Sequence, residues 1–129
     1  MKKVIILFCC VLILFSCNNI DRKSEHVSRQ DTSYLDPNFK YIHLIPDSLR
    51  TPEQNKFLMD LQLVIIDHLK SVNNEMVFTL NEQQFVEKGF PKEYYTLIQK
   101  NLRDNNKYFK ENNIKNVDSI IKESFKQFK

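Results

Sequence analysis

The apolar and polar positions divide the chain into a short apolar block, a polar stretch and a longer region with regular periodicity. Residues 4–15 form an unbroken apolar run of 12 residues behind the positive pair Lys2 and Lys3. A transmembrane helix needs about 20 such residues. The run is therefore too short to span a bilayer and has the charge and length of a signal-peptide core.

Residues 18–38 are polar and mixed in charge, without helical or alternating apolar periodicity. Such a composition indicates a flexible tether with a root-mean-square span of about 25 Å, from about 5 to 6 Å times the square root of its length. We therefore expect a signal segment over residues 1–16, a tether over residues 17–38 and one small folded domain over residues 39–129.

The longest predicted helix begins at Thr51 and continues to about Val72. Thr51 is placed as the N-cap, Pro52 as the first helical residue, and Gln54 as the partner of Thr51 in a capping box. Apolar residues then recur every three or four positions, which predicts the central helix of the core. These residues are Leu58, Leu61, Ile65, Leu69 and Val72.

Two short strands are expected on either side of this helix. Residues 39–45 are aromatic and β-branched and end at Pro46, which cannot donate to a ladder. Asn73 and Asn74 interrupt the helical pattern, and residues 76–80 form a second apolar stretch. A two-stranded sheet in a β-helix-β unit is the expected arrangement.

Three further helices complete the prediction. Asn81 and Gln84 have the spacing of a second capping box, and the helix they start ends at Gly89, the only glycine in the chain. The next helix runs from Pro91 to about Glu111, and one side of it carries Tyr94, Tyr95, Ile98, Leu102, Asn105 and Phe109. The last helix has an apolar stripe of Val117, Ile120, Ile121, Phe125 and Phe128. The fold class is mainly α with a minor two-stranded β element, a small α+β domain with three to four helices.

The sequence Leu14-Phe15-Ser16-Cys17 resembles the lipobox of bacterial lipoproteins. The resemblance implies cleavage between Ser16 and Cys17, diacylglycerol on the Cys17 sulfur and an acyl group on its new amino group. Two or three acyl chains anchor a protein stably. The resemblance thus implies a lipid-anchored protein of the bacterial cell envelope, with the outer membrane favoured over the inner. The alternative is an ordinary secretory signal with a cysteine there by chance.

Charge and cysteine content narrow the function classes. Residues 1–16 contain two of the 19 basic residues, which leaves 19 − 2 = 17 bases against 16 acids, a net charge of +1. Such a balance gives no general field for nucleic acid. Cys9 and Cys10 leave with the signal and Cys17 takes the lipid, so neither a disulfide nor a cysteine-based zinc site is expected.

Reactive groups are few. The imidazoles are those of His26, His43 and His68, for which a hydrogen-bonded or edge-of-core position is the simpler interpretation. Asp60 and Asp67 could line one helix face, as solvated charges or, less simply, as paired carboxylates. We therefore expect no enzyme, no metal and no cofactor beyond the lipid on Cys17. An enzyme that uses His43 or His68 is the least favoured alternative.

Recognition is expected at the turn that follows Gly89, where Phe90, Pro91, Tyr94 and Tyr95 are placed as partner contacts. Tyrosine offers a large contact area with little rotamer entropy to lose. The alternative is that two helices pack through this tight corner. The C-terminal lysines have two interpretations as well, a solvated helix face or a contact with anionic headgroups or an acidic partner.

These observations predict a non-enzymatic protein-interaction module, such as an assembly accessory, an inhibitor or an immunity-type protein. A carrier of a small apolar or lipid ligand is the alternative, and it would need a pocket of about 300 Å³ or more.

Overall fold

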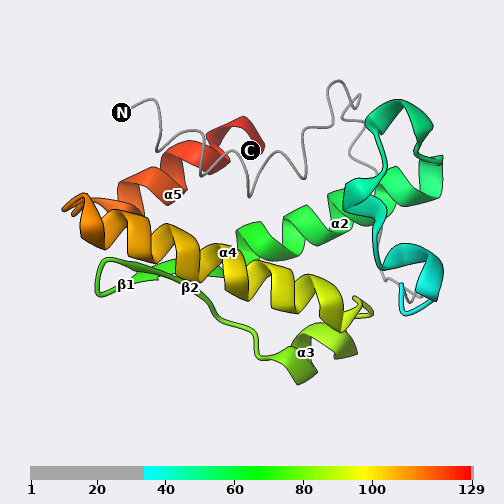
Figure 1. Cartoon of the computed structure of the whole chain (residues 1–129), viewed down its shortest axis with the longest axis horizontal. Helices are drawn as coiled ribbons and strands as arrows, with labels where there is room; N and C mark the ends of the chain where they lie inside the picture. The colour runs from blue at the N-terminus through cyan, green and yellow to red at the C-terminus, as the bar shows by residue number, and fades with distance from the viewer. Residues whose placement is uncertain (1–33, 129) are drawn as a thin grey trace.

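The computed structural model describes residues 34–128, which form a mainly helical domain with one two-stranded antiparallel sheet (Figure 1). This confirms the predicted fold class. The helices and strands are α2 (Pro52–His68), β1 (Leu69–Val72), β2 (Glu75–Phe78), α3 (Glu82–Glu87), α4 (Lys92–Glu111) and α5 (Val117–Phe125). The predicted signal segment, Cys17 and most of the tether lie outside the described residues.

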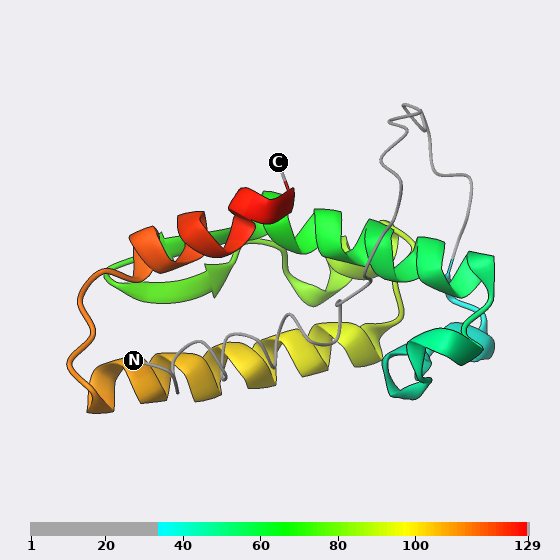
Figure 2. The same ribbon diagram turned by 90° about the horizontal axis from the view of Figure 1, so that it is seen from above.

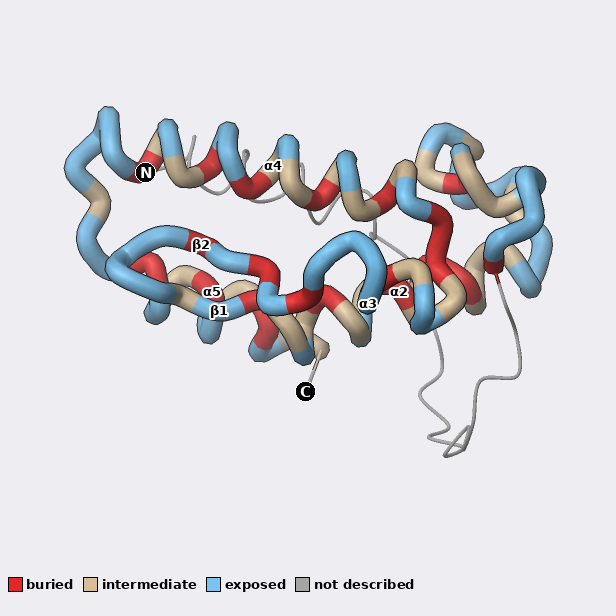
Figure 3. The backbone as a smooth tube through the Cα atoms, turned by 90° about the horizontal axis from the view of Figure 1, so that it is seen from below, coloured by how far each residue is buried: buried red, intermediate tan, exposed pale blue. Residues whose placement is uncertain are grey.

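The domain has two layers, with α4 in one layer and α2, the hairpin and α5 in the other (Figure 2). Figure 3 shows that the buried positions of α4 point toward the second layer and its exposed positions point away. The buried residues of α4 are Tyr94, Ile98, Leu102, Asn105 and Phe109, as its apolar spacing predicts. The core therefore lies between the layers.

Helix α2 begins as predicted and ends four residues earlier than expected. Thr51 and Gln54 exchange the two capping-box hydrogen bonds, at 3.2 and 2.9 Å. The helix ends at His68, and Leu69 is already extended, with φ −90° and ψ 124°. The predicted continuation to Val72 is wrong, because those four residues form β1.

The sheet is a hairpin, so the predicted β-helix-β unit is wrong. Asn73 and Asn74 have φ values of 51° and 63°. Positive φ at both central residues is what a two-residue type I′ hairpin turn requires, and asparagine tolerates it. β1 and β2 pair antiparallel from Leu69 opposite Phe78 to Val72 opposite Glu75.

The hairpin is attached to the helices by two asparagine side chains. The Asn74 amide donates to the carbonyl of Ile114 at 2.7 Å, and its oxygen accepts from the N–H of Val117, the first residue of α5, at 3.2 Å. On α4, the Asn106 amide oxygen accepts from the Met76 N–H at 2.7 Å, and its nitrogen donates to the Met76 carbonyl at 2.9 Å. Both bonds of Asn106 lie on the outer edge of β2.

Residues 39–45 are not the expected strand. They belong to a chain of 3-10 turns, Pro37–Phe39, Ile42–Leu44 and Asp47–Leu49. A strand in this segment would need a free sheet edge to pair with. The outer edge of β2 is not free at Met76, because Asn106 bonds to its backbone there. The turns instead bring Phe39 and Ile42 to the core. Packing also begins before residue 39, since Tyr34 is only 2% exposed.

The connection from α3 to α4 follows the prediction. Asn81 and Gln84 form the second capping box, at 2.8 and 2.9 Å. Gly89, with φ 95°, lies just beyond α3 in the left-handed region that favours glycine. Pro91 is the N-cap of α4. This sharp corner places the start of α4 against α3.

Candidate interaction surfaces

The predicted partner contacts lie mostly in the core. Phe90 is 0% exposed, Tyr94 is 3% exposed and Pro91 is buried, whereas Tyr95 is half-buried. The rings of Phe57 and Tyr34 pack on Phe90, with centroids 5.9 and 5.7 Å away. Phe90, Pro91 and Tyr94 are therefore not exposed for direct contact with a partner, and their burial agrees with the alternative interpretation of a packed corner.

These corner residues instead hold the chain's own N-terminal segment, residues 34–50. The Tyr34 N–H donates to the Gly89 carbonyl at 2.7 Å. The Ile42 N–H donates to the Tyr94 hydroxyl oxygen at 2.9 Å. Burial raises the pKa of Tyr94 to about 12, so its hydroxyl keeps its proton at any physiological pH.

A second attachment joins this segment to α2. The Tyr34 hydroxyl donates to Asp60 Oδ2 at 2.5 Å, and Lys56 Nζ contacts the same carboxylate at 2.8 Å and the Tyr34 oxygen at 3.2 Å. Burial and the bond to Asp60 raise the pKa of Tyr34, and the same carboxylate raises the pKa of Lys56. Asp60 thus fastens the segment, while Asp67 is exposed and about 10.5 Å farther along the helix axis. The two do not form a carboxylate pair.

The segment of residues 34–50 carries three large apolar side chains that are exposed, which we name the apolar tip. Tyr41 is 61% exposed, and Leu44 and Leu49 are each 71% exposed. The backbone beneath them is held by 3-10 hydrogen bonds, from the Leu44 N–H to the Tyr41 carbonyl and from the Leu49 N–H to the Pro46 carbonyl, at 3.0 and 2.9 Å. The apolar tip is therefore exposed apolar surface on an ordered backbone.

The sequence contains a signal for this segment, which periodicity alone does not reveal. Asp36 caps the first turn by accepting from the Asn38 N–H at 2.8 Å, and Pro37 follows it at the first position of that turn. Pro46 is the N-cap of the third turn. Two Asx or proline turn starts within about ten residues argue against a strand.

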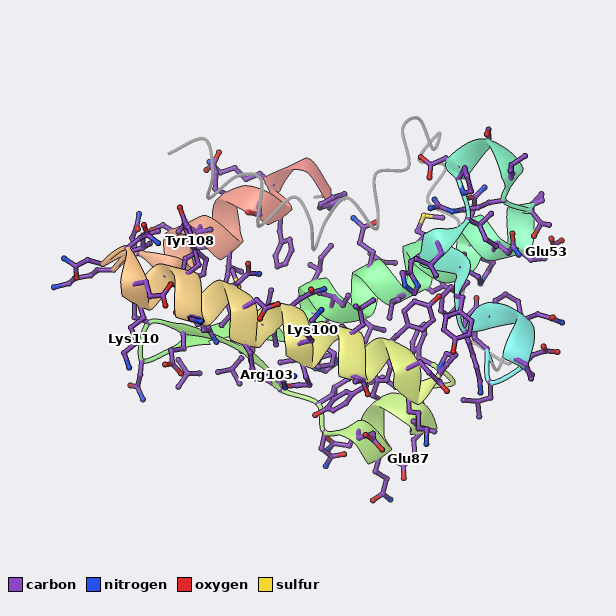
Figure 4. All side chains as sticks on the ribbon, viewed as in Figure 1. Glu53, Glu87, Lys100, Arg103, Tyr108 and Lys110 are labelled. Atoms are coloured by element: carbon purple, nitrogen blue, oxygen red, sulfur yellow. The ribbon has the colours of Figure 1, made fainter. Side chains whose placement is uncertain are left out.

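The outer face of α4 carries a second surface, which we name the basic ridge. All of its members are exposed and recur at helical spacing: Lys92, Lys100, Arg103, Lys107 and Lys110. Figure 4 labels Lys100, Arg103 and Lys110, which are spread along α4. Among these five side chains of the described domain, only Lys107 has a carboxylate within 4.0 Å, that of Glu111 at 3.9 Å.

Two lysines near the C-terminus, one in α5 and one directly after it, differ from the ridge because they are paired. Lys122 Nζ lies 2.6 Å from Asp118, and Lys126 Nζ lies 2.5 Å from Glu123. This arrangement favours the solvated-face interpretation for Lys122 and Lys126.

The described histidines have partners of their own. His43 Nδ1 lies 3.4 Å from the Tyr94 hydroxyl oxygen, and burial, followed by the charge of Arg50, lowers the pKa of His43. His68 Nδ1 lies 3.1 Å from Thr79 Oγ1. His26 lies outside the described residues. Both imidazoles thus bond to a hydroxyl oxygen and lie at different ends of α2.

Residues 34–128 contain no group of three histidine, cysteine or acidic side chains placed to hold a metal ion. In the same residues, no helix has the length and apolar character needed to cross a membrane.

Comparisons with known proteins give no relative to compare these surfaces with. A scan of protein-family models, a search of curated proteins and a search of solved structures each found no match to this chain.

Proposed function

We propose that this chain is a membrane-anchored bacterial envelope lipoprotein that acts as a non-enzymatic protein-interaction module and binds its partner through the apolar tip. The observation that carries the proposal is the exposure of Tyr41, Leu44 and Leu49, at 61%, 71% and 71%, on a segment held to α2 and α4. Large apolar side chains on an ordered backbone bind with little loss of entropy. An accessory, an inhibitor and an immunity-type protein all act in this way.

The predicted anchor at Cys17 supports an encounter with a partner at the membrane. Sixteen residues, 18–33, separate Cys17 from Tyr34. As a flexible coil they would span about 22 Å on average. The apolar tip would therefore stay close to the membrane, where its effective concentration for a membrane-bound partner is high.

The packing of the core favours this function over carriage of a small apolar ligand. Phe57 is 0% exposed, and its ring lies 4.8 Å from that of Tyr34 and 5.0 Å from that of Tyr94. The aromatic side chains that would line a ligand pocket are thus in contact with one another.

A photocrosslinking experiment in cells tests the proposal. A photoreactive amino acid at position 44 or 49 should capture one protein from the envelope, whereas the same group at Leu63, an exposed aliphatic residue of α2, should not. With the captured protein purified, Leu49→Ser should weaken its binding at least about tenfold, as expected for loss of a central apolar contact. Equal capture from Leu63, or no captured protein, would refute the function.

The anchor is tested separately. Cys17→Ser should move the mature protein from the membrane fraction to the soluble fraction, because the acyl chains supply stable attachment. Membrane fractionation that persists in high salt after this change would contradict the anchor.

A further inference from the structure

The basic ridge of α4 presents a straight line of positive charge. Its first and last members, Lys92 and Lys110, are 18 residues apart, which is about 27 Å along a helix. At about 100° per residue, all five cations fall within about 80° of the helix circumference. Glu93, Asp104 and Glu111 lie at one border of this arc and do not interrupt it, and Glu93 is paired with Lys40 at 3.2 Å.

From this arrangement we infer that the basic ridge docks on a membrane leaflet that contains anionic lipid headgroups. The inference rests on the proposed lipid anchor for its membrane, and it adds a second, electrostatic contact that orients the domain. Each lysine or arginine near an anionic leaflet strengthens attachment by about fivefold.

Most cations of the ridge have no ion-pair partner within the described residues, so their charge is available for such a contact. In α5 and the turn after it, each of Lys122 and Lys126 has a carboxylate within 2.6 Å, whereas on the ridge the nearest carboxylate is 3.9 Å from Lys107. Cations without an ion-pair partner keep their attraction for an external anion, because no salt bridge must be broken first.

The entry point of the tether places the ridge beside the anchor. The hydrogen bond from the Tyr34 N–H to the Gly89 carbonyl, at 2.7 Å, holds the start of the described chain three residues before Lys92. The tether therefore joins the domain at the same end where the ridge begins. A lipid at Cys17 would bring this end of α4 to the bilayer first.

The chemistry of the ridge favours lipid headgroups over an acidic protein. Between Lys92 and Lys110 the central line of the exposed face is completed by Thr96, so the ridge offers no aromatic or aliphatic side chain to a partner. Protein interfaces depend on such buried anchors for affinity. Flexible cationic side chains on a convex helix suit a flat layer of mobile headgroups.

Vesicle binding by the full mature chain carrying Cys17→Ser tests the ridge without the lipid. Sedimentation should show binding to vesicles of about 70% phosphatidylethanolamine and 30% phosphatidylglycerol, and none to phosphatidylcholine, with the binding lost as salt rises. Lys100→Gln/Arg103→Gln/Lys107→Gln should weaken binding about 100-fold.

A matched control removes the same charge from α5 and the residues that flank it, with Lys115→Gln/Lys122→Gln/Lys126→Gln, and should change binding by less than about threefold. All six side chains are exposed, and circular dichroism checks that both variants stay folded. Equal loss in the two variants, no binding to the anionic vesicles, or equal binding to phosphatidylcholine would overturn the inference.

Labelling with radioactive palmitate separates this result from the anchor. If Cys17 stays unlabelled while the ridge binds anionic vesicles, the anchor is contradicted and headgroup binding stands. If Cys17 is labelled and the unlipidated chain does not bind the anionic vesicles, the proposal that the ridge docks on lipid is wrong and the anchor stands.

Discussion

The Tyr94 hydroxyl accepts a hydrogen bond from the backbone N–H of Ile42 at 2.9 Å, across 52 positions of the chain. Both residues are buried, at 3% and 0% exposure. This bond joins the segment that carries the apolar tip to the first turn of α4. A buried N–H has few other acceptors available, so the loss of this bond would weaken the attachment of that segment.

Tyr94→Phe should remove this acceptor and leave the Ile42 N–H without one. The expected cost is about 1 to 3 kcal/mol of the free energy of unfolding, the desolvation penalty of a buried donor. Urea denaturation measures the cost, and hydrogen exchange should become faster at the Ile42 amide. Tyr95→Phe, at the half-buried neighbour, should stay within about 0.5 kcal/mol. Equal stability of the two variants would contradict the role of the bond.

Asn74→Gly should destabilise the domain more than Asn73→Gly does. Both positions have positive φ, which glycine adopts freely, so the turn itself survives in both variants. Only the Asn74 side chain bonds to Ile114 and Val117. Loss of two bonds costs about 1 to 3 kcal/mol. Thermal denaturation of the pair measures the difference, and identical midpoints would show that the attachment of α5 does not depend on Asn74.

Ile65→Asp should unfold the domain, whereas Leu63→Asp should not. Ile65 is 5% exposed and faces the core, but Leu63, two residues away on α2, is 50% exposed. A buried charge without a partner costs several kcal/mol against a total stability of about 5 to 15 kcal/mol. Circular dichroism on heating distinguishes the two, and a cooperative transition in Ile65→Asp near that of the wild type would show that the core lies elsewhere.

His43 should make the domain less stable in mild acid. Burial and Arg50 lower the pKa of His43 from its usual 6.5 in the folded state, so the unfolded chain binds this proton more readily. The contribution of His43 is therefore complete above pH 6.5 and is lost as the pH falls through the lowered pKa. The free energy of unfolding, measured at about pH 7.5 and about pH 5, should fall more in the wild type than in His43→Gln. The same fall in both proteins would refute this assignment.

Local signals predicted the parts of the fold that depend on neighbouring residues. The two capping boxes, at Thr51 and at Asn81, need only residues three positions apart, and both formed as expected. The left-handed backbone conformation of Gly89 depends only on the lack of a side chain at that residue. The apolar stripe of α4 follows from periodicity in one helix, and its buried residues match it.

The hairpin could not be predicted from local signals, because its stability comes from the pairing of β1 with β2. Ile65, Leu69 and Val72 have helical spacing, yet Leu69 opposes Phe78 and Val72 opposes Glu75 in the sheet. Asn73 and Asn74 form the turn that reverses the direction of the chain, although their local pattern predicts only the end of a helix. The apolar pattern of one segment contains no information about the hydrogen bonds that a second segment can form with it.

The interaction surfaces also depend on contacts between distant segments of the chain. Phe90 and Tyr94 looked like recognition residues because nothing in the local sequence reveals that Tyr34 and Ile42 cover them. The basic ridge was accessible from the spacing of Lys100, Arg103 and Lys107 alone. The near-zero net charge of the mature chain concealed it, because a total does not report how charges are distributed on one helix face.

The paired bonds of Asn106 to Met76 have a consequence for association between molecules. A two-stranded hairpin has open edges, and an open edge is a template on which a strand from another chain can add. The Asn106 amide presents one carbonyl and one N–H to β2 at the spacing of a neighbouring strand, and it ends the ladder after a single residue. A helix side chain thus takes the place of the next strand at Met76, which opposes the addition of a strand from another copy at this edge of β2.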